Sequence, residues 1–157
     1  MGCSMLFFVF LSFFCRIILL TLLALCFLCF VLGPEHDAAR ANMGGSWRMP
    51  TFEELRVLCE MTTSAWTDNY EGSGIAGCII SGKGRYADRT MFLPATGIFS
   101  GVSHLHASFQ GYYWSSSLHD GSDVKYLGSV VGGSVSPYGY NNRYFGFPVR
   151  AVFTFSE

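Results

Sequence analysis

Ser115, His119 and Asp120 carry the side-chain types of a hydrolytic triad within a span of six residues. A triad needs its hydroxyl, imidazole and carboxylate within hydrogen-bond reach of one another, and tertiary geometry rather than short spacing provides that arrangement. The serine run also lacks the G-x-S-x-G turn that exposes a nucleophile in α/β-hydrolases. Asp120 and Asp123 have the chemistry of a glycosidic carboxylate pair, although two loop acids are more simply solvated. We therefore predict that the chain is not an enzyme.

The patterns for metal and phosphate chemistry are equally sparse. His104 and His106 form an H-x-H pair, but a metal site needs further ligands and the sequence identifies no third one. Asp120 and Asp123 offer oxygen ligands for calcium, yet no E-P-N or Q-P-D motif of sugar-binding lectins accompanies them. The G-K-G turn at 82–84 lacks the frame and the following helix of a phosphate-binding loop. The sequence predicts no metal site and no cofactor.

The segment 111–150 instead has the composition of a recognition surface. It opens with G-Y-Y-W-S-S-S (111–117), closes with N-N-R-Y-F-G-F-P-V-R (141–150), and is rich in Gly, Ser and Tyr between them. Tyrosine provides a large contact area at low entropic cost, and Ser, Gly and Asn adapt their hydrogen bonds to a partner. We predict that a ligand contacts the polar and tyrosine side chains of 118–144, namely His119, Asp120, Asp123, Lys125, Tyr126, Tyr138, Tyr140, Asn141, Asn142 and Tyr144.

The two ends of this segment should form the supporting frame. Phe147, Val149, Ala151, Phe153 and Phe155 alternate with more polar residues, which predicts a strand over 147–155 with one buried face. We expect Trp114, Phe147, Val149 and Arg150 to belong to the frame and Trp114 to be buried.

Together with H-D-A-A-R-A-N-M-G-G-S-W-R-M-P-T (36–51) and F-L-P-A-T-G (92–97), these motifs resemble the FISUMP-type major paralogous domain family. The resemblance covers roughly 33–157. It implies a C-type-lectin-like fold related to that of the sulfatase-modifying factors, and it implies binding of a protein or glycan by a variable face. Some bacterial or phage-like relatives are diversified by retroelements that rewrite adenines in codons near the C-terminus. Most of the predicted contact residues are types that an Asn codon reaches by such changes.

An oxidase activity does not follow from the resemblance. The sulfatase-modifying relatives work through a cysteine pair in the C-terminal part of the domain, and this chain has no cysteine after Cys78. Two function classes remain open, a ligand-binding module and a structural or orphan fragment with no ligand of its own.

Capping and periodicity predict the elements that would position this surface. Pro34 and the pair Gly44-Gly45 delimit a short helix over 34–43. Thr51 and Glu54 form a capping box that begins a second helix. Beyond it, turn signals dominate 62–89, with one strand expected at 75–81, a strand at 90–95 and a loop over 97–111. The predicted class is α+β, with two short helices flanking a small, mostly antiparallel sheet.

The segment 5–32 is almost continuously apolar, with a single charge at Arg16, and is long enough to span a membrane. No basic n-region or small-residue cleavage site indicates a signal peptide, so we expect a helical anchor over 1–33 and a domain over 34–157 that faces the cell exterior or periplasm. Two alternatives are a secreted domain and a misassigned start. Relatives of the resembling family carry early strands before the H-D-A-A-R motif, where this chain has the apolar segment. If the start is misassigned, the strand at 147–155 would lack its native partner.

Charge and cysteine content set two further bounds. The net charge of -1, without a basic stripe, argues against nucleic acid as a partner. Cys59 and Cys78 lie outside the apolar segment, and they either pair in an oxidising compartment or remain independent buried thiols.

Overall fold

Short helices and small antiparallel sheets make up residues 31–154, the part of the chain that the computed structural model describes, and all of the helices precede β4. The elements are η1 (Pro34–His36), α2 (Ala38–Met43), β1 (Trp47–Arg48), α3 (Phe52–Met61), β2 (Thr62–Thr67), η2 (Tyr70–Gly72), β3 (Gly77–Gly82), η3 (Gly84–Tyr86), β4 (Thr90–Pro94), β5 (Ile98–Ser100), β6 (Ser103–Leu105), β7 (Gln110–Leu118), β8 (Asp123–Val130), β9 (Val135–Asn142) and β10 (Val152–Phe153). They confirm the predicted α+β class.

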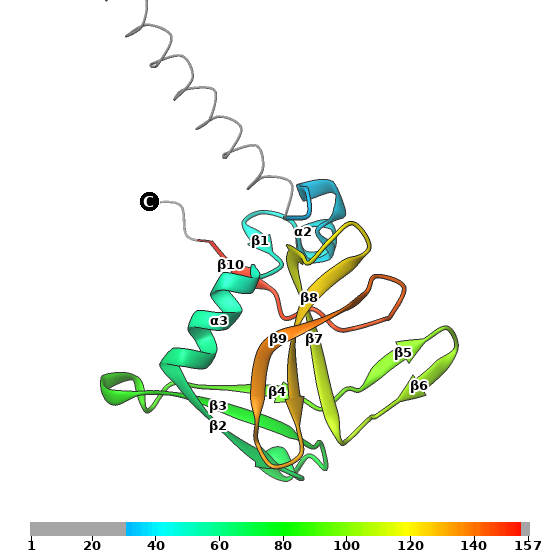
Figure 1. The fold of residues 1–157 in the computed structure, drawn as a ribbon. Coiled ribbons are helices and arrows are strands. Elements are labelled where there is room, and N and C mark those ends of the chain that lie inside the picture. Colours follow the sequence, from blue (N-terminus) through cyan, green and yellow to red (C-terminus); the bar gives the residue numbers. More distant parts are fainter. Residues whose placement is uncertain (1–30, 155–157) are drawn as a thin grey trace, which may run out of the picture. The chain divides into compact units, whose positions relative to one another are not determined.

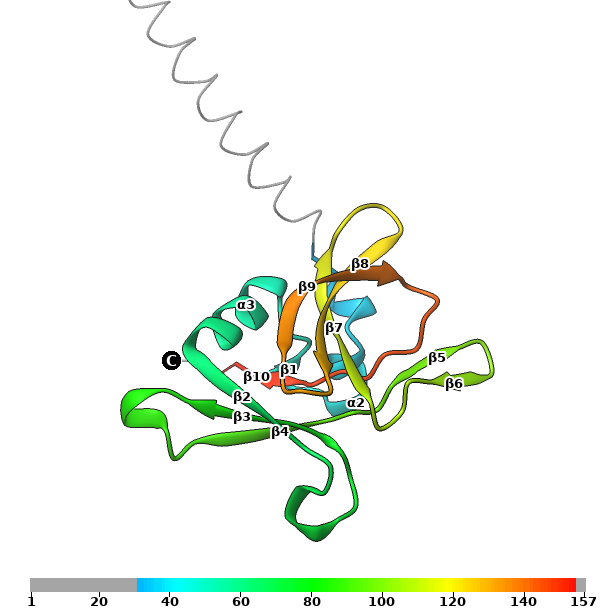
Figure 2. The same ribbon diagram turned by 60° about the horizontal axis from the view of Figure 1, so that its bottom comes forward.

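Two three-stranded sheets organise the domain. Their strand orders are β2-β3-β4 and β7-β8-β9, and all of their pairings are antiparallel. Figure 1 shows α3 beside β9, and Figure 2 shows the first sheet crossing beneath the second. The core fills the junction of the two sheets with α3, where Leu55, Cys78, Ile80, Leu93, Tyr113 and Leu127 are buried.

Capping side chains define the helices. Asp37 accepts a hydrogen bond from the Arg40 amide at 3.0 Å and thereby begins α2, so 34–43 forms a 3₁₀ turn and a helix instead of the single helix that we predicted. The Asp37 carboxylate also accepts from the Met49 amide at 2.9 Å, which holds the following turn against α2. The predicted capping box of Thr51 and Glu54 is confirmed at the start of α3.

The serine run of β7 attaches this helix to the second sheet. The Phe52 amide donates to Ser117 Oγ at 3.0 Å, and the Ser116 amide donates to the Pro50 carbonyl at 2.8 Å. Ser115 is buried and donates to the Lys125 carbonyl at 2.7 Å, so it cannot serve as an exposed nucleophile beside His119. The serines therefore position the N-terminus of α3.

Several expected boundaries were wrong. The region 62–89 contains β2 as well as β3, and 97–111 contains the hairpin β5-β6, because each of these strands finds an antiparallel partner despite weak local signals. Of the expected strand over 147–155, the described residues form only β10. Phe147 is buried as predicted, but Arg150 is exposed and Phe153 keeps 44% of its surface exposed.

β10 has a pairing partner among the described residues. It pairs with β1, and Trp47 packs edge-on against Phe153 with ring centroids 5.1 Å apart. In the segment before β10, the Trp114 amide donates a hydrogen bond to the Pro148 carbonyl at 3.1 Å. Pro148 has no amide hydrogen, so it cannot donate the next hydrogen bond of a strand ladder. The C-terminal segment is therefore held by isolated hydrogen bonds and a two-residue sheet.

Cys59 and Cys78 are free thiols, so the independent-thiol alternative is confirmed for this structure. Burial raises the pKa of both. The apolar segment 5–32 lies, except for its last two residues, outside the described part of the chain. Among the described residues, no helix has the length and apolar character needed to cross a membrane.

Candidate functional site

The register of the β7-β8-β9 sheet separates the predicted contact residues onto two faces. Lys125 lies opposite Tyr140, whereas the next residue along β8, Tyr126, lies between Trp114 on β7 and Gly139 on β9. Because successive side chains of a strand point to opposite faces, Tyr140 and Tyr126 cannot share a surface. We name the side with Phe52, His119, Lys125, Tyr138 and Tyr140 the α3-side face.

Aromatic contacts connect the side chains of the α3-side face. The His119 imidazole stacks on the Tyr140 ring with centroids 3.8 Å apart. Lys125 Nζ lies 4.1 Å from the centre of the Phe52 ring, and Tyr138 packs edge-on against the same ring at 6.1 Å. Tyr138 and Tyr140 nevertheless remain 68% and 55% exposed. These side chains form a solvent-facing surface of aromatic rings with a cation among them, on β8, β9, the loop after β7 and the first turn of α3.

The loop between β7 and β8 uses its polar groups internally. Asp120 accepts hydrogen bonds from the amides of Ser122 and Asp123 at 2.8 and 2.9 Å, and the Ser122 bond is the main reason why the pKa of Asp120 is lowered. Arg143 crosses to the same loop and donates to the carbonyl oxygens of Gly121 and Ser122. Asp120 is therefore a turn-forming residue here. No cluster of three or more potential metal ligands occurs between residues 31 and 154.

Tyr126 was expected to be exposed, and this is wrong. It is half-buried on the opposite face, where its ring lies 5.5 Å from that of Tyr112, 6.2 Å from Trp114 and 5.2 Å from Phe147. Burial raises its pKa. The ring also covers Gly139, where an added Cβ would approach it to 2.2 Å. Tyr126 is a packing residue.

Asn141, Asn142 and Tyr144 lie at the end of β9 and in the turn after it. Asn141 Oδ1 accepts from the Asn142 amide at 2.9 Å, and Asn142 pairs with Asp123 across the strands. Tyr144 is exposed, and its ring packs against Phe145 at 4.4 Å. None of the three has a ring contact with Tyr138 or Tyr140 among the described residues.

The two histidines of the H-x-H pair lie in and just after the β5-β6 hairpin. His104 stacks on Phe99 at 4.3 Å, and its Nε2 is 2.6 Å from the Thr96 carbonyl oxygen. His106 adopts a positive φ of 60° in the turn that precedes β7. The His104 imidazole is therefore held by contacts within its own hairpin and with Thr96.

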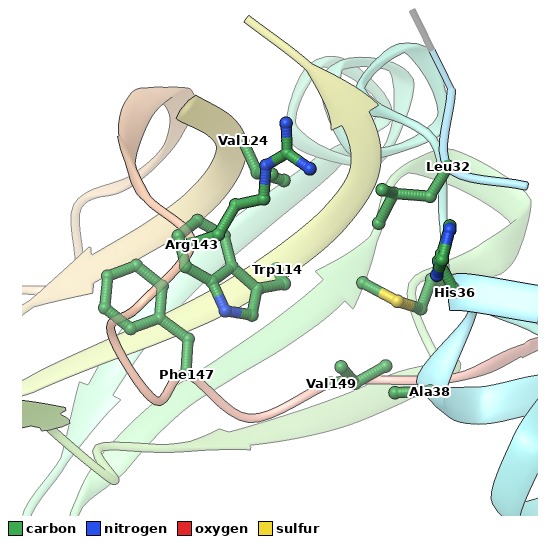
Figure 3. Close-up of a pocket in the computed structure, with 9 residues that line it drawn as sticks. Leu32, His36, Ala38, Trp114, Val124, Arg143, Phe147 and Val149 are labelled. Atoms are coloured by element: carbon green, nitrogen blue, oxygen red, sulfur yellow. The ribbon is translucent and has the colours of Figure 1, made fainter. Parts of the chain in front are cut away.

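Sequence reasoning missed a pocket of about 360 Å³ on the side of the sheet that carries Trp114. Trp114 was expected to be buried, but it is half-buried, stacks on Phe147 at 4.1 Å and lines this pocket. Figure 3 shows Trp114 and Phe147 on one side and Leu32 with His36 on the other. The complete lining is Leu32, His36, Ala38, Met49, Trp114, Val124, Arg143, Phe147 and Val149.

Comparisons with family models, with curated proteins and with solved structures give no match to this chain.

Proposed function

We propose that the chain is a non-enzymatic ligand-binding module that contacts a protein or glycan through the α3-side face. The observation that carries this proposal is the group of exposed rings formed by His119, Tyr138 and Tyr140 around Lys125. Exposed aromatic rings supply most of the contact energy at recognition surfaces, and Lys125 adds a hydrogen-bond donor.

We further propose a C-type-lectin-like fold for 34–157, as the family resemblance implies. In support of this proposal, the motifs that carry the resemblance lie where helices begin and a strand ends. Asp37 caps α2, Thr51 caps α3, and β4 ends within F-L-P-A-T-G. In addition, β1 and β10 pair near the two ends of the described residues. The experiment that tests the fold is a crystal structure of the full chain, and a different strand connectivity from that of C-type-lectin-like domains would contradict it.

Binding can be tested on immobilised glycan and peptide arrays with the purified full chain. We expect hits that are lost in Tyr138→Ala and Tyr140→Ala but retained in Tyr86→Ala, because Tyr86 is similarly exposed but belongs to η3. Hits that survive both substitutions on the face, or that disappear equally in the control, would contradict the use of this surface.

Retroelement diversification of this surface is a separate proposal. Its support is that Tyr138, Tyr140 and Tyr144 are exposed, so other side chains can replace them at low cost in stability. Sequencing the surrounding genome tests it. A nearby imperfect copy of the codons for 111–150, differing at adenines, is the expected finding, and the proposal fails if the locus has no such copy.

A further inference from the structure

We infer that the pocket beside Trp114 binds a small carboxylate with an apolar or aromatic body. This site lies on the face of the β7-β8-β9 sheet opposite Tyr140, so the inference does not depend on the proposed function of the α3-side face. Its volume of about 360 Å³ falls in the range of about 300–1,000 Å³ that small-molecule sites occupy.

The walls of the pocket suit an apolar body. Trp114 and Phe147 form a continuous aromatic wall through their stacked rings, and Val149 adds an aliphatic side chain to it. The Trp114 indole contributes a nitrogen donor that has no hydrogen-bond partner among residues 31–154. A flat ligand would therefore pack against the rings and meet one polar group.

The charges at the rim favour an anion. Arg143 and His36 line the pocket and no carboxylate does. His36 already faces Glu35 at 3.7 Å, and the nearby Asp37 is buried and bonded to the amides of Arg40 and Met49. Arg143 is different, because its Nε and Nη2 donate to backbone carbonyls and orient the group, while Nη1 has no partner within the described chain.

A guanidinium that is already oriented by two hydrogen bonds and still has an unused N–H donor can bind a carboxylate well. The reason is that charge-assisted hydrogen bonds are stronger than neutral ones. Figure 3 shows Arg143 above Trp114 and Val124. The carboxylate would contact Arg143 at the rim, with the apolar body placed against Trp114 and Phe147.

The test compares three probes of one shape: 3-phenylpropanoate, 3-phenylpropanamide and 3-phenylpropylamine. Calorimetric titration uses the full chain in a mild detergent, with protein-free detergent as the blank. We expect the acid to bind about tenfold more tightly than the amide, as for one charge-assisted hydrogen bond, and the amine to bind most weakly. Equal affinities for acid and amide, or no binding of the acid at millimolar concentration, would overturn the inference.

Two substitutions separate charge from shape. Arg143→Gln should remove the preference for acid over amide, whereas Arg85→Gln, an exposed arginine over Tyr86, should leave it unchanged. Ala38→Leu places a larger side chain at the pocket and should weaken the binding of both the acid and the amide. Ala41→Leu, on the exposed part of the same helix, serves as its control. Retained acid preference in Arg143→Gln, or unchanged binding in Ala38→Leu, contradicts the assignment.

Discussion

At the scale of single residues, Glu54 connects a helix cap to an ion pair. It accepts hydrogen bonds from Arg48 Nη1 and Nη2 at 2.7 and 2.6 Å and from the Thr51 amide at 2.8 Å. The Arg48 hydrogen bond is the main cause that lowers the pKa of Glu54 from 4.5 to about 2, and the Thr51 amide adds to the effect against the opposing influence of burial. A lowered folded-state pKa means that this stabilisation is present above pH 4.5 and is lost as the pH falls toward 2.

We therefore predict that Glu54→Gln removes part of the acid sensitivity of folding. Because Glu54 is partly exposed, solvent screening limits the pH-dependent contribution to about 1 kcal/mol. Urea unfolding at a series of pH values between 2 and 6 measures it, and Arg48→Gln should reduce the same contribution. If the variant and the parent protein lose stability equally over this range, the pair does not carry the effect.

The exposed tyrosines of the α3-side face should contribute little to folding. Tyr138→Ala and Tyr140→Ala should each change the free energy of unfolding by no more than about 1 kcal/mol, since each loses one ring contact at an exposed site. Leu127→Ala, in the buried core, should cost about 2–5 kcal/mol. Trp114→Ala should fall between them, at about 2 kcal/mol, because Trp114 is only half-buried. Thermal melts distinguish the classes, and a Tyr138 or Tyr140 effect as large as that of Leu127 would place these rings in the core.

At the scale of elements, the packing of β8 on β9 depends on Gly139. The Tyr126 ring occupies the space of a side chain at this position, and Tyr112, Trp114 and Phe147 surround the ring. We predict that Gly139→Ala destabilises the protein by about 1–3 kcal/mol through overpacking. Gly121→Ala is the matched control, because its Cβ would meet open space.

The same substitution in a Tyr126→Leu background tests the mechanism. A smaller side chain at 126 leaves room for the new methyl group, so the added cost of Gly139→Ala should fall below its cost in the parent protein. Equal costs in the two backgrounds, measured by urea unfolding, would show that the ring is not the cause.

At the scale of the whole molecule, the sequence predicts that 5–32 anchors the chain in a membrane, because its apolar length matches a bilayer span. Fractionation of the tagged full chain should place it in the membrane pellet after a carbonate wash. Replacing Leu19, Leu20, Leu22 and Leu23 by Asn should shift it toward the soluble fraction. Recovery of the parent chain in the soluble fraction with Met1 intact would contradict the anchor.

The sequence by itself determined features that a few neighbouring residues control. The Thr51 capping box predicted the start of α3, and the short apolar run predicted β4. These predictions succeeded because a cap or a buried strand depends on side chains within a few positions of one another. The independent state of Cys59 and Cys78 was left open, since sequence does not specify the distance between two residues.

Only the tertiary structure decided which side chains share a surface. Strand register placed Tyr140 opposite Lys125 and moved Tyr126 to the other face, although all three belong to one polar, aromatic segment. The pocket brings His36 and Leu32 together with Trp114 and Arg143, which are more than seventy positions away in the chain. The alternation of side chains along one strand is a local property that the sequence shows. Which strand pairs with it, and which segment covers its face, depends on long-range packing that no local pattern encodes.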